Sequence, residues 1–126
     1  ITLARIEMGH FGFQRALEKI WKLISGVNRY VENNAPWTLA KSTDPKDKRK
    51  LEEVLIHCHE SLRIASLFLV PFIPKSAKQA LTYLGTESDL SVPAPLLTQL
   101  EWGKGPKSVK VTKSSPLFPR LEMPKA

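Results

Sequence analysis

Residues 28–41 read NRYVENNAPWTLAK and separate two long helical patterns. Asn34 is a good N-cap, because its side-chain oxygen can accept from the free N–H groups in the first turn of a helix. Pro36 suits an early helical position, where its missing N–H costs nothing. The stretch therefore predicts a structural turn at Asn34, followed by a short helix that displays Trp37 on its first turn.

Residue chemistry leaves two interpretations of Trp37. Large aromatic side chains mostly pack, which favours the indole as a core anchor wedged between helices. The functional alternative is that unpaired N–H groups at the helix start attract phosphate while the flat ring stacks on a nucleotide base. Chemistry by itself favours the core anchor.

Helical periodicity extends on both sides of this turn. Before it, apolar residues recur at helical spacing from Phe13 to Val31, which predicts an amphipathic helix ending near residue 31 or 32. Asn28 lies at the edge of that stripe, where we expect its amide to bond the backbone of the turn. After the turn, Asp44 and Pro45 open another helix. Its expected inner face is Leu51, Val54, Leu55, Cys58, Leu62, Ala65 and Leu69.

The remaining signals complete an all-α fold. Prolines at positions 71 and 74 end the second long helix, and a shorter helix follows with Gly85 as its C-terminal cap. Residues 1–12 are ambiguous, because Gly9 and Gly12 weaken any helix there. Three amphipathic helices and one short helix predict an antiparallel helical bundle over residues 1–85.

Residues 86–108 are rich in Ser, Pro and Gly. Residues 86–126 are predicted to be a loop-rich extension, which we expect to pack on the bundle or towards another domain. Leu96, Leu97 and Leu100 form an apolar patch within it. Residues 107–113 alternate between apolar and basic side chains, which is typical of a short strand. Residues 115–120 contain two prolines and predict an extended segment across a surface.

The composition favours a polyanionic partner. The chain of 126 residues is of single-domain size, 42% hydrophobic, with a formal net charge of +7 and a pI near 9.7. Residues 101–126 carry six basic and two acidic side chains. Arg29 and Lys41 flank the Trp37 turn, where they could contact phosphates. For each of them singly, a solvated helix face is an equally good explanation.

The single cysteine, Cys58, excludes an internal disulfide and favours a reducing compartment. The longest apolar run, residues 67–73, is too short for a membrane span and contains Pro71. We therefore expect no membrane partner. The chain begins at Ile1 instead of Met, which indicates a processed or excised piece.

No pattern indicates catalysis. His57, Cys58 and His59 are consecutive, and on a helix three consecutive side chains point in different directions and cannot close on one ion. No serine has the neighbours that would activate a hydroxyl, and no glycine-rich phosphate loop is present. We expect no metal, no cofactor and no catalytic residue in this segment.

Three runs in order carry a resemblance. They are ALEKIWKLISGVNRYVENNAPWTLAK, VLIHCHESLRIASLFLVPFIPKSA, and PLFPRLE after a glycine-terminated helix. Together they resemble the C-terminal anticodon-binding domain of methionyl-tRNA synthetase, over residues 13–122. Single pieces such as APW would be weak evidence, whereas the ordered set is specific.

The resemblance implies a helical bundle that binds the anticodon stem-loop of a methionine tRNA. The Trp of the family's APW motif stacks on the first anticodon base with the preceding Pro beside it, which corresponds to Trp37 and Pro36. The family's PLFPR segment runs back towards the catalytic domain, so Leu117, Phe118 and Arg120 are expected at an interdomain surface. The parent reaction would attach methionine to tRNA with ATP bound in the catalytic domain. A cytoplasmic location is implied, with an organellar one as the alternative, and DNA is not an expected partner.

The chain departs from the family pattern in two ways. Nothing before Phe13 resembles the asparagine-rich helix that carries the family's other base-reading residues, so we expect apolar surface left exposed on the bundle. The HIGH and KMSKS signatures for ATP binding and methionine activation are also missing. From a different functional class, the alternative is a helical protein-interaction domain whose basic surface is incidental.

Overall fold

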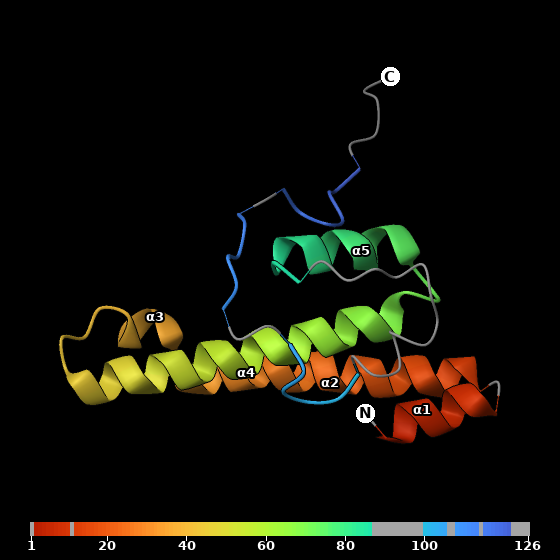
Figure 1. The fold of residues 1–126 in the computed structure, drawn as a ribbon, viewed down its shortest axis with the longest axis horizontal. Coiled ribbons are helices and arrows are strands. Elements are labelled where there is room, and N and C mark those ends of the chain that lie inside the picture. Colours follow the sequence, from red (N-terminus) through yellow and green to blue (C-terminus); the bar gives the residue numbers. More distant parts are fainter. Residues whose placement is uncertain (1, 11, 87–99, 106–107, 114, 122–126) are drawn as a thin grey trace.

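The protein folds into helices joined by short connections (Figure 1). A computed structural model describes residues 2–10, 12–86, 100–105, 108–113 and 115–121. Within these residues the helices are α1 (Thr2–Gly9), α2 (Phe13–Asn34), α3 (Pro36–Leu39), α4 (Pro45–Leu69) and α5 (Pro74–Tyr83). The all-α prediction is confirmed. The predicted apolar patch at Leu96 and Leu97 lies outside the described residues.

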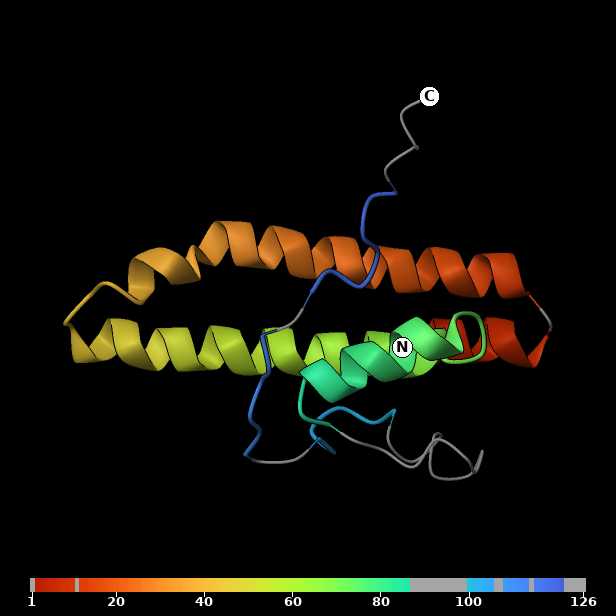
Figure 2. The ribbon, with the colours of Figure 1, turned by 90° about the horizontal axis from the view of Figure 1, so that it is seen from above.

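The long helices α2 and α4 lie antiparallel and side by side in both views (Figures 1 and 2). α1 packs on α2, whereas α3 and α5 both pack on α4. α3 lies at one end of the bundle, and α1 lies at the other. The predicted antiparallel bundle is therefore present, with the Trp37 turn at one of its ends.

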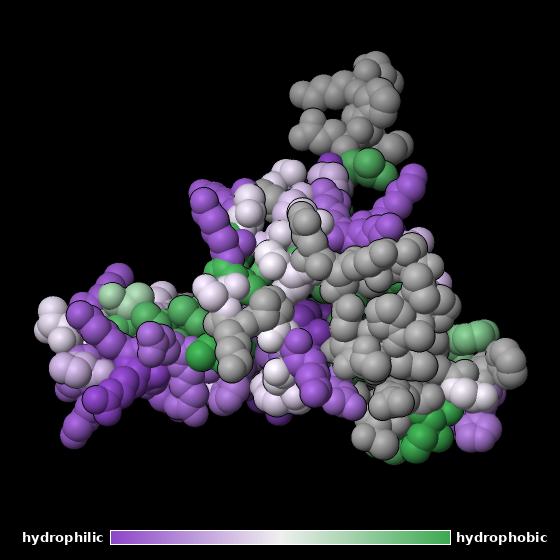
Figure 3. Space-filling model, viewed as in Figure 1, coloured by the Kyte–Doolittle hydropathy of each residue, from purple (hydrophilic) through white to green (hydrophobic). Residues whose placement is uncertain are grey.

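The segment before Phe13 is more regular than expected. α1 is helical up to Gly9, and the chain then turns where the Gly12 N–H donates to the Glu7 carbonyl at 2.7 Å. The sequence of α1, TLARIEMG, contains no asparagine, so α1 is not the asparagine-bearing helix of the family pattern. Its Leu3 and Ile6 side chains are exposed, and apolar surface gathers where α1 lies, at the lower right of Figure 3.

The junction between α2 and α3 corrects two predictions. α2 continues to Asn34, and the Asn34 side-chain amide donates to the Tyr30 carbonyl at 2.8 Å. Asn34 therefore closes α2, and Ala35, not Asn34, is the N-cap of α3. Asn28 is exposed within α2, well before the turn, so it does not hold the turn's backbone. The turn depends instead on Ala35, whose φ of 40° and ψ of 61° are left-handed.

α4 begins as predicted, with Asp44 as its N-cap and Pro45 in its first turn. The Asp44 carboxylate accepts from the Lys46 N–H at 2.8 Å. The buried face of α4 differs from the predicted apolar stripe, because Leu55 and Leu62 are exposed. Burial is concentrated in its second half, at Glu60, Ser61, Arg63, Ile64, Ala65, Ser66, Leu67 and Phe68, whereas Val54 is buried in the first half.

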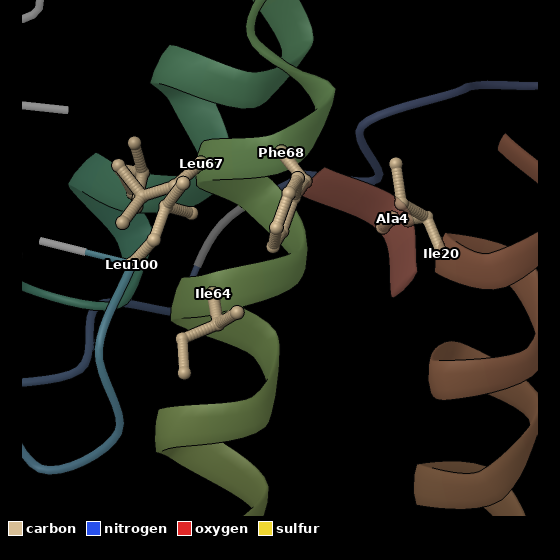
Figure 4. Close-up of a cluster of buried hydrophobic side chains, with 7 residues drawn as sticks. Ala4, Ile20, Ile64, Leu67, Phe68 and Leu100 are labelled. Atoms are coloured by element: carbon tan, nitrogen blue, oxygen red, sulfur yellow. The ribbon is translucent and has the colours of Figure 1, made fainter. Parts of the chain in front are cut away.

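The main apolar cluster joins this second half of α4 to the other elements (Figure 4). Phe68 points towards Ala4 of α1 and Ile20 of α2, whereas Leu67 and Ile64 lie on the side of Leu100. Leu81 of α5 completes the cluster. Because most of the core lies away from α3, the α3 end is thin, and α3 has no buried residue.

The end of α5 confirms the predicted role of Gly85. With Gly85 at φ 70°, the Thr86 N–H donates to the Leu81 carbonyl and the Gly85 N–H to the Thr82 carbonyl, each at 3.0 Å. This pattern is the Schellman cap, which satisfies the last carbonyls of a helix. A Cβ at Gly85 would lie 2.6 Å from the Lys110 carbonyl oxygen, so the close approach of the chain also requires glycine.

The extension after α5 is irregular in its described part. Residues 108–113 form no strand, so the predicted strand is wrong there. A single backbone bond, from the Thr112 N–H to the Tyr83 carbonyl at 2.9 Å, ties this segment to α5. With Leu100 in the core, the described part of the extension packs on the bundle. The domain boundary at residue 85 stays a prediction.

A buried ion pair on α4 anchors the loop at residues 101–105. The Arg63 guanidinium donates to both carboxylate oxygens of Glu60, at 2.8 and 2.7 Å. Arg63 also donates to the Glu101 carbonyl at 3.1 Å, and the Gly103 N–H donates to Glu60 at 2.8 Å. Nothing in the sequence analysis singled out this pair, although the i,i+3 spacing of Glu and Arg on a helix is the signal for it.

The Arg63 hydrogen bond is the main cause that holds the pKa of Glu60 below its usual range. Burial opposes this effect, and hydrogen bonds from the Gly103 and Gly105 N–H groups support it.

Among the helices described, none is both long and apolar enough to cross a membrane.

Ala35→Gly should raise the free energy of unfolding by up to about 1 kcal/mol, because a non-glycine residue in the left-handed region is strained. The matched control is Ala40→Gly, at φ −64°, which should lower the same quantity by about 0.5–1 kcal/mol. Urea denaturation of both variants measures the difference. Equal losses from the two substitutions would contradict the strain at Ala35.

Glu60→Gln should lower the free energy of unfolding by about 3 kcal/mol or more at neutral pH, because it removes the negative charge with which the buried Arg63 guanidinium pairs. A lowered carboxyl pKa contributes stability above the unfolded-state value, and this contribution is lost as pH falls through the folded-state value. The difference in the free energy of unfolding between wild type and variant should therefore narrow as the pH falls below the usual pKa range of a carboxyl group. Glu101→Gln is the control, since the ion pair of that side chain with Lys104, at 3.8 Å, is exposed to solvent. This substitution should change the free energy of unfolding by at most about 0.5 kcal/mol. A gap that stays constant with pH would contradict this account.

Candidate nucleic-acid interface

The Trp37 indole is open to solvent at the α3 end of the bundle, with 56% of the residue surface exposed. The interpretation of Trp37 as a buried core anchor is therefore wrong. Backbone bonds fix its position, because the Ala35 carbonyl accepts from the Thr38 N–H at 2.8 Å and the Leu39 N–H at 3.3 Å. Pro36, half-buried, restricts the backbone just before the indole. The result is a large, flat ring held on a rigid turn.

The expected anion site at the start of α3 is weaker than the sequence suggested. Pro36 has no N–H, and the Thr38 and Leu39 N–H groups are already bonded to Ala35. Only the Trp37 N–H is left of the first-turn donors, and a helix of four residues has a small dipole. Attraction for phosphate must therefore come from side chains.

Two exposed basic side chains flank the turn. Arg29 lies on α2 ahead of the turn, and Lys41 follows α3, where its N–H donates to the Thr38 carbonyl at 3.1 Å. Neither side chain is in an ion pair with another described residue. Both charges are thus available to a polyanion, and their role in phosphate contact stays a prediction.

The His57, Cys58 and His59 side chains diverge. His57 shares a 3.1 Å hydrogen bond with the Tyr30 hydroxyl of α2, whereas His59 donates to the Leu84 carbonyl at the end of α5. Cys58 is half-buried, and burial raises the pKa of its thiol. Among the described residues, no group of three His, Cys, Asp or Glu side chains could hold a metal ion.

The predicted interdomain residues form a separate surface. Phe118 is 69% exposed, Arg120 is exposed and Leu117 is half-buried. Both views place this segment over the middle of the bundle, away from α3 (Figures 1 and 2). The structure therefore brings Pro36, Trp37 and Lys41 together and keeps Leu117, Phe118 and Arg120 apart from them, and both assigned roles stay predictions.

Comparison with known proteins gives a consistent relationship. No protein-family model matches the chain. The methionine–tRNA ligase of Lactococcus lactis is 41% identical over 117 residues, which are 92% of this chain and 17% of that protein. Methionine–tRNA ligase 1 of Bacillus anthracis is 36% identical over 124 residues, 97% of this chain and 18% of that protein.

Solved structures agree with this relationship. The apo form of Mycobacterium tuberculosis methionyl-tRNA synthetase superposes with a TM-score of 0.75 and 30% identity, over 97% of this chain and 24% of that chain. The same enzyme in complex with methionyl-adenylate superposes with a TM-score of 0.74 over 94% of this chain. The chain is thus similar over nearly its whole length to methionyl-tRNA synthetases, and it spans 17–18% of the length of the relatives that it matches.

Proposed function

We propose that this chain is the anticodon-binding segment of a methionine–tRNA ligase. The observation that carries the proposal is the exposed Trp37 indole on a rigid turn, at the position of the family's APW motif. The segment supplies recognition only. Activation of methionine with ATP and its transfer to tRNA take place in a catalytic domain outside this chain.

Stacking provides the affinity at this site. An unstacked base in a single-stranded loop gains about 1–3 kcal/mol on an aromatic ring. Single-stranded loops are the usual targets of sequence-specific RNA-binding proteins. Because every base has a flat face, stacking discriminates weakly. Specificity for the methionine anticodon therefore requires hydrogen bonds from residues outside this chain, on the asparagine-bearing helix of the family pattern.

The other predicted residues have supporting roles in this proposal. Pro36 restricts the backbone beside the stacked base, and Arg29 and Lys41 attract the RNA backbone. Leu117, Phe118 and Arg120 face the catalytic domain of the same protein, where the exposed Phe118 ring would be covered. Such a ligase would act in the cytoplasm or in an organelle.

Trp37→Ala should reduce kcat/KM for the methionine tRNA by roughly tenfold or more in a ligase that contains this chain, as expected for the loss of one stacked base. Trp37→Phe is the matched variant and should retain most of the activity, because phenylalanine keeps an aromatic face. Activation of methionine without tRNA, measured by pyrophosphate exchange, should be unchanged in both variants. Unchanged aminoacylation by Trp37→Ala would refute the assignment.

Arg29→Gln and Lys41→Gln should each weaken tRNA binding and reduce the slope of log K against log salt by about 1, because each contact releases one counterion. Lys75→Gln, on α5 and away from the α3 end, is the control and should leave the slope unchanged. Filter binding between 50 and 200 mM salt, a range over which each phosphate contact changes the affinity by roughly threefold, measures these slopes. Equal slopes for all three variants would favour the helical protein-interaction domain with an incidental basic charge.

A further inference from the structure

Trp102, one of three exposed tryptophans with Trp21 and Trp37, has its backbone held by contacts of a different kind from those at Trp37. The residue is 52% exposed, and both of its flanking peptide groups are anchored to the buried ion pair. The Glu101 carbonyl accepts from Arg63, and the Gly103 N–H donates to Glu60. Buried ion pairs contribute little net stability, so the consequence of this one is positional: it fixes the backbone on which the indole is displayed.

Trp102 borders a groove of about 470 Å³ between α2 and α4. The polar and aromatic residues that line it are Lys22, Tyr30, His57, Ser61 and Trp102, with Gly26 and two aliphatic side chains completing the wall. Among the described residues that line it, Lys22 is the only charged one, and none is a carboxylate. The groove therefore has a positive balance, which suits an anionic ligand.

The aromatic rings along this groove form a continuous series. Tyr30 and His57 have ring centroids 6.0 Å apart, and His57 and Trp102 have centroids 6.1 Å apart with planes inclined at 48°. The Tyr30 hydroxyl is bonded to His57 Nδ1, which leaves the His57 Nε2 for another partner. An aromatic face, nitrogen and hydroxyl groups for hydrogen bonding, and one ammonium group thus converge on one space.

We propose that the groove between Lys22 and Trp102 binds a nucleotide of single-stranded RNA, with the base stacked on the Trp102 indole and its phosphate near Lys22. His57 and Ser61 then provide hydrogen bonds to the base edge. Stacking together with one cationic contact is the usual combination in sites for unpaired nucleotides. A volume of about 470 Å³ lies within the range of small-ligand sites and exceeds what a single side chain needs.

This inference rests on the proposed function for the source of the RNA, and it adds a second contact to the same tRNA. His57 is 12 residues after the start of α4, which is about 18 Å along the helix axis from the end near α3. We assign the base on Trp102 to a different nucleotide from the one proposed for Trp37, because the two indoles lie on different segments, the loop at residues 101–105 and α3. Two separated stacking positions would fix the orientation of the bound loop as well as its affinity.

Gly26 offers a test that does not depend on removing a structural side chain. A Cβ built at Gly26 meets no atom within 4 Å, and Gly26 lines the groove. Gly26→Leu therefore adds an apolar side chain at the wall of the groove, starting from open space, and it improves the helix propensity of α2. Ser25→Leu is the matched control, because Ser25 is exposed on the same helix and does not line the groove. Both variants should remain folded by circular dichroism.

Binding of the complete methionine tRNA to a ligase containing this chain should weaken about fivefold or more in Trp102→Ala, the lower limit for one lost stacking contact. Gly26→Leu should weaken binding to a similar extent, whereas Trp102→Phe and Ser25→Leu should bind nearly as wild type. Wild-type affinity for both Trp102→Ala and Gly26→Leu would overturn the inference.

Trp37→Ala separates this result from the proposed function. If Trp37→Ala weakens binding while Gly26→Leu and Trp102→Ala do not, the anticodon assignment stands and the second site is wrong. If the groove variants weaken binding and Trp37→Ala does not, the groove binds RNA and the assignment of Trp37 is wrong. If no variant changes the affinity, both proposals fail.

Discussion

The burial of Ile20 against the second half of α4 is the interaction on which the arrangement depends. Ile64, Leu67 and Phe68 present apolar surface to three different neighbours, namely α1 and α2 on one side and α5 with Leu100 on the other. Because these neighbours all gather at the same half of α4, most of the core is there, and the other half of α4 has little more than α2 and α3 beside it. A protein with a core of this shape necessarily has a thin end.

The thin end of the bundle, where α3 lies, explains why a large aromatic side chain can be exposed there without disturbing the core. Trp37 is exposed and α3 has no buried residue, yet the left-handed Ala35 and the ring of Pro36 hold its backbone in one conformation. The strain at Ala35 and the exposure of the indole both oppose stability. Local features that cost stability are retained at functional sites more often than elsewhere, which agrees with a binding role for this turn.

The ion pair of Glu60 and Arg63 likewise holds an exposed indole in place, at the middle of the bundle. Both side chains are buried, and each uses its remaining hydrogen-bonding capacity on the loop that carries Trp102. An apolar pair would pack as well, but it could not accept or donate to that loop's backbone. The polar pair thus specifies where a loop without helix or strand is held, and it places a second indole at the border of a groove.

The sequence by itself determined α2 to α5 and their limits to within a few residues, whereas it left α1 ambiguous because Gly9 and Gly12 weaken a helix there. Apolar spacing predicted α2 and α4, and the chemistry of Asp44, Pro45 and Gly85 predicted where α4 begins and α5 ends, because periodicity and capping are local properties. The ordered motifs also indicated the similarity to methionyl-tRNA synthetases that the comparisons found. Asn34 was misassigned as a cap, since the competing bond to Tyr30 depends on α2 extending further than its apolar pattern.

Only the tertiary structure decided which faces are buried and therefore which residues can bind. Local chemistry favoured a buried Trp37 and an inward-facing Leu55, and both are exposed in a structure whose described core gathers at the second half of α4. The strand predicted for residues 107–113 did not form in its described part, since an alternating pattern needs a partner strand and the Thr112 N–H donates to the Tyr83 carbonyl at the end of α5. Exposure and pairing are set by contacts between distant segments, which spacing along the chain does not encode.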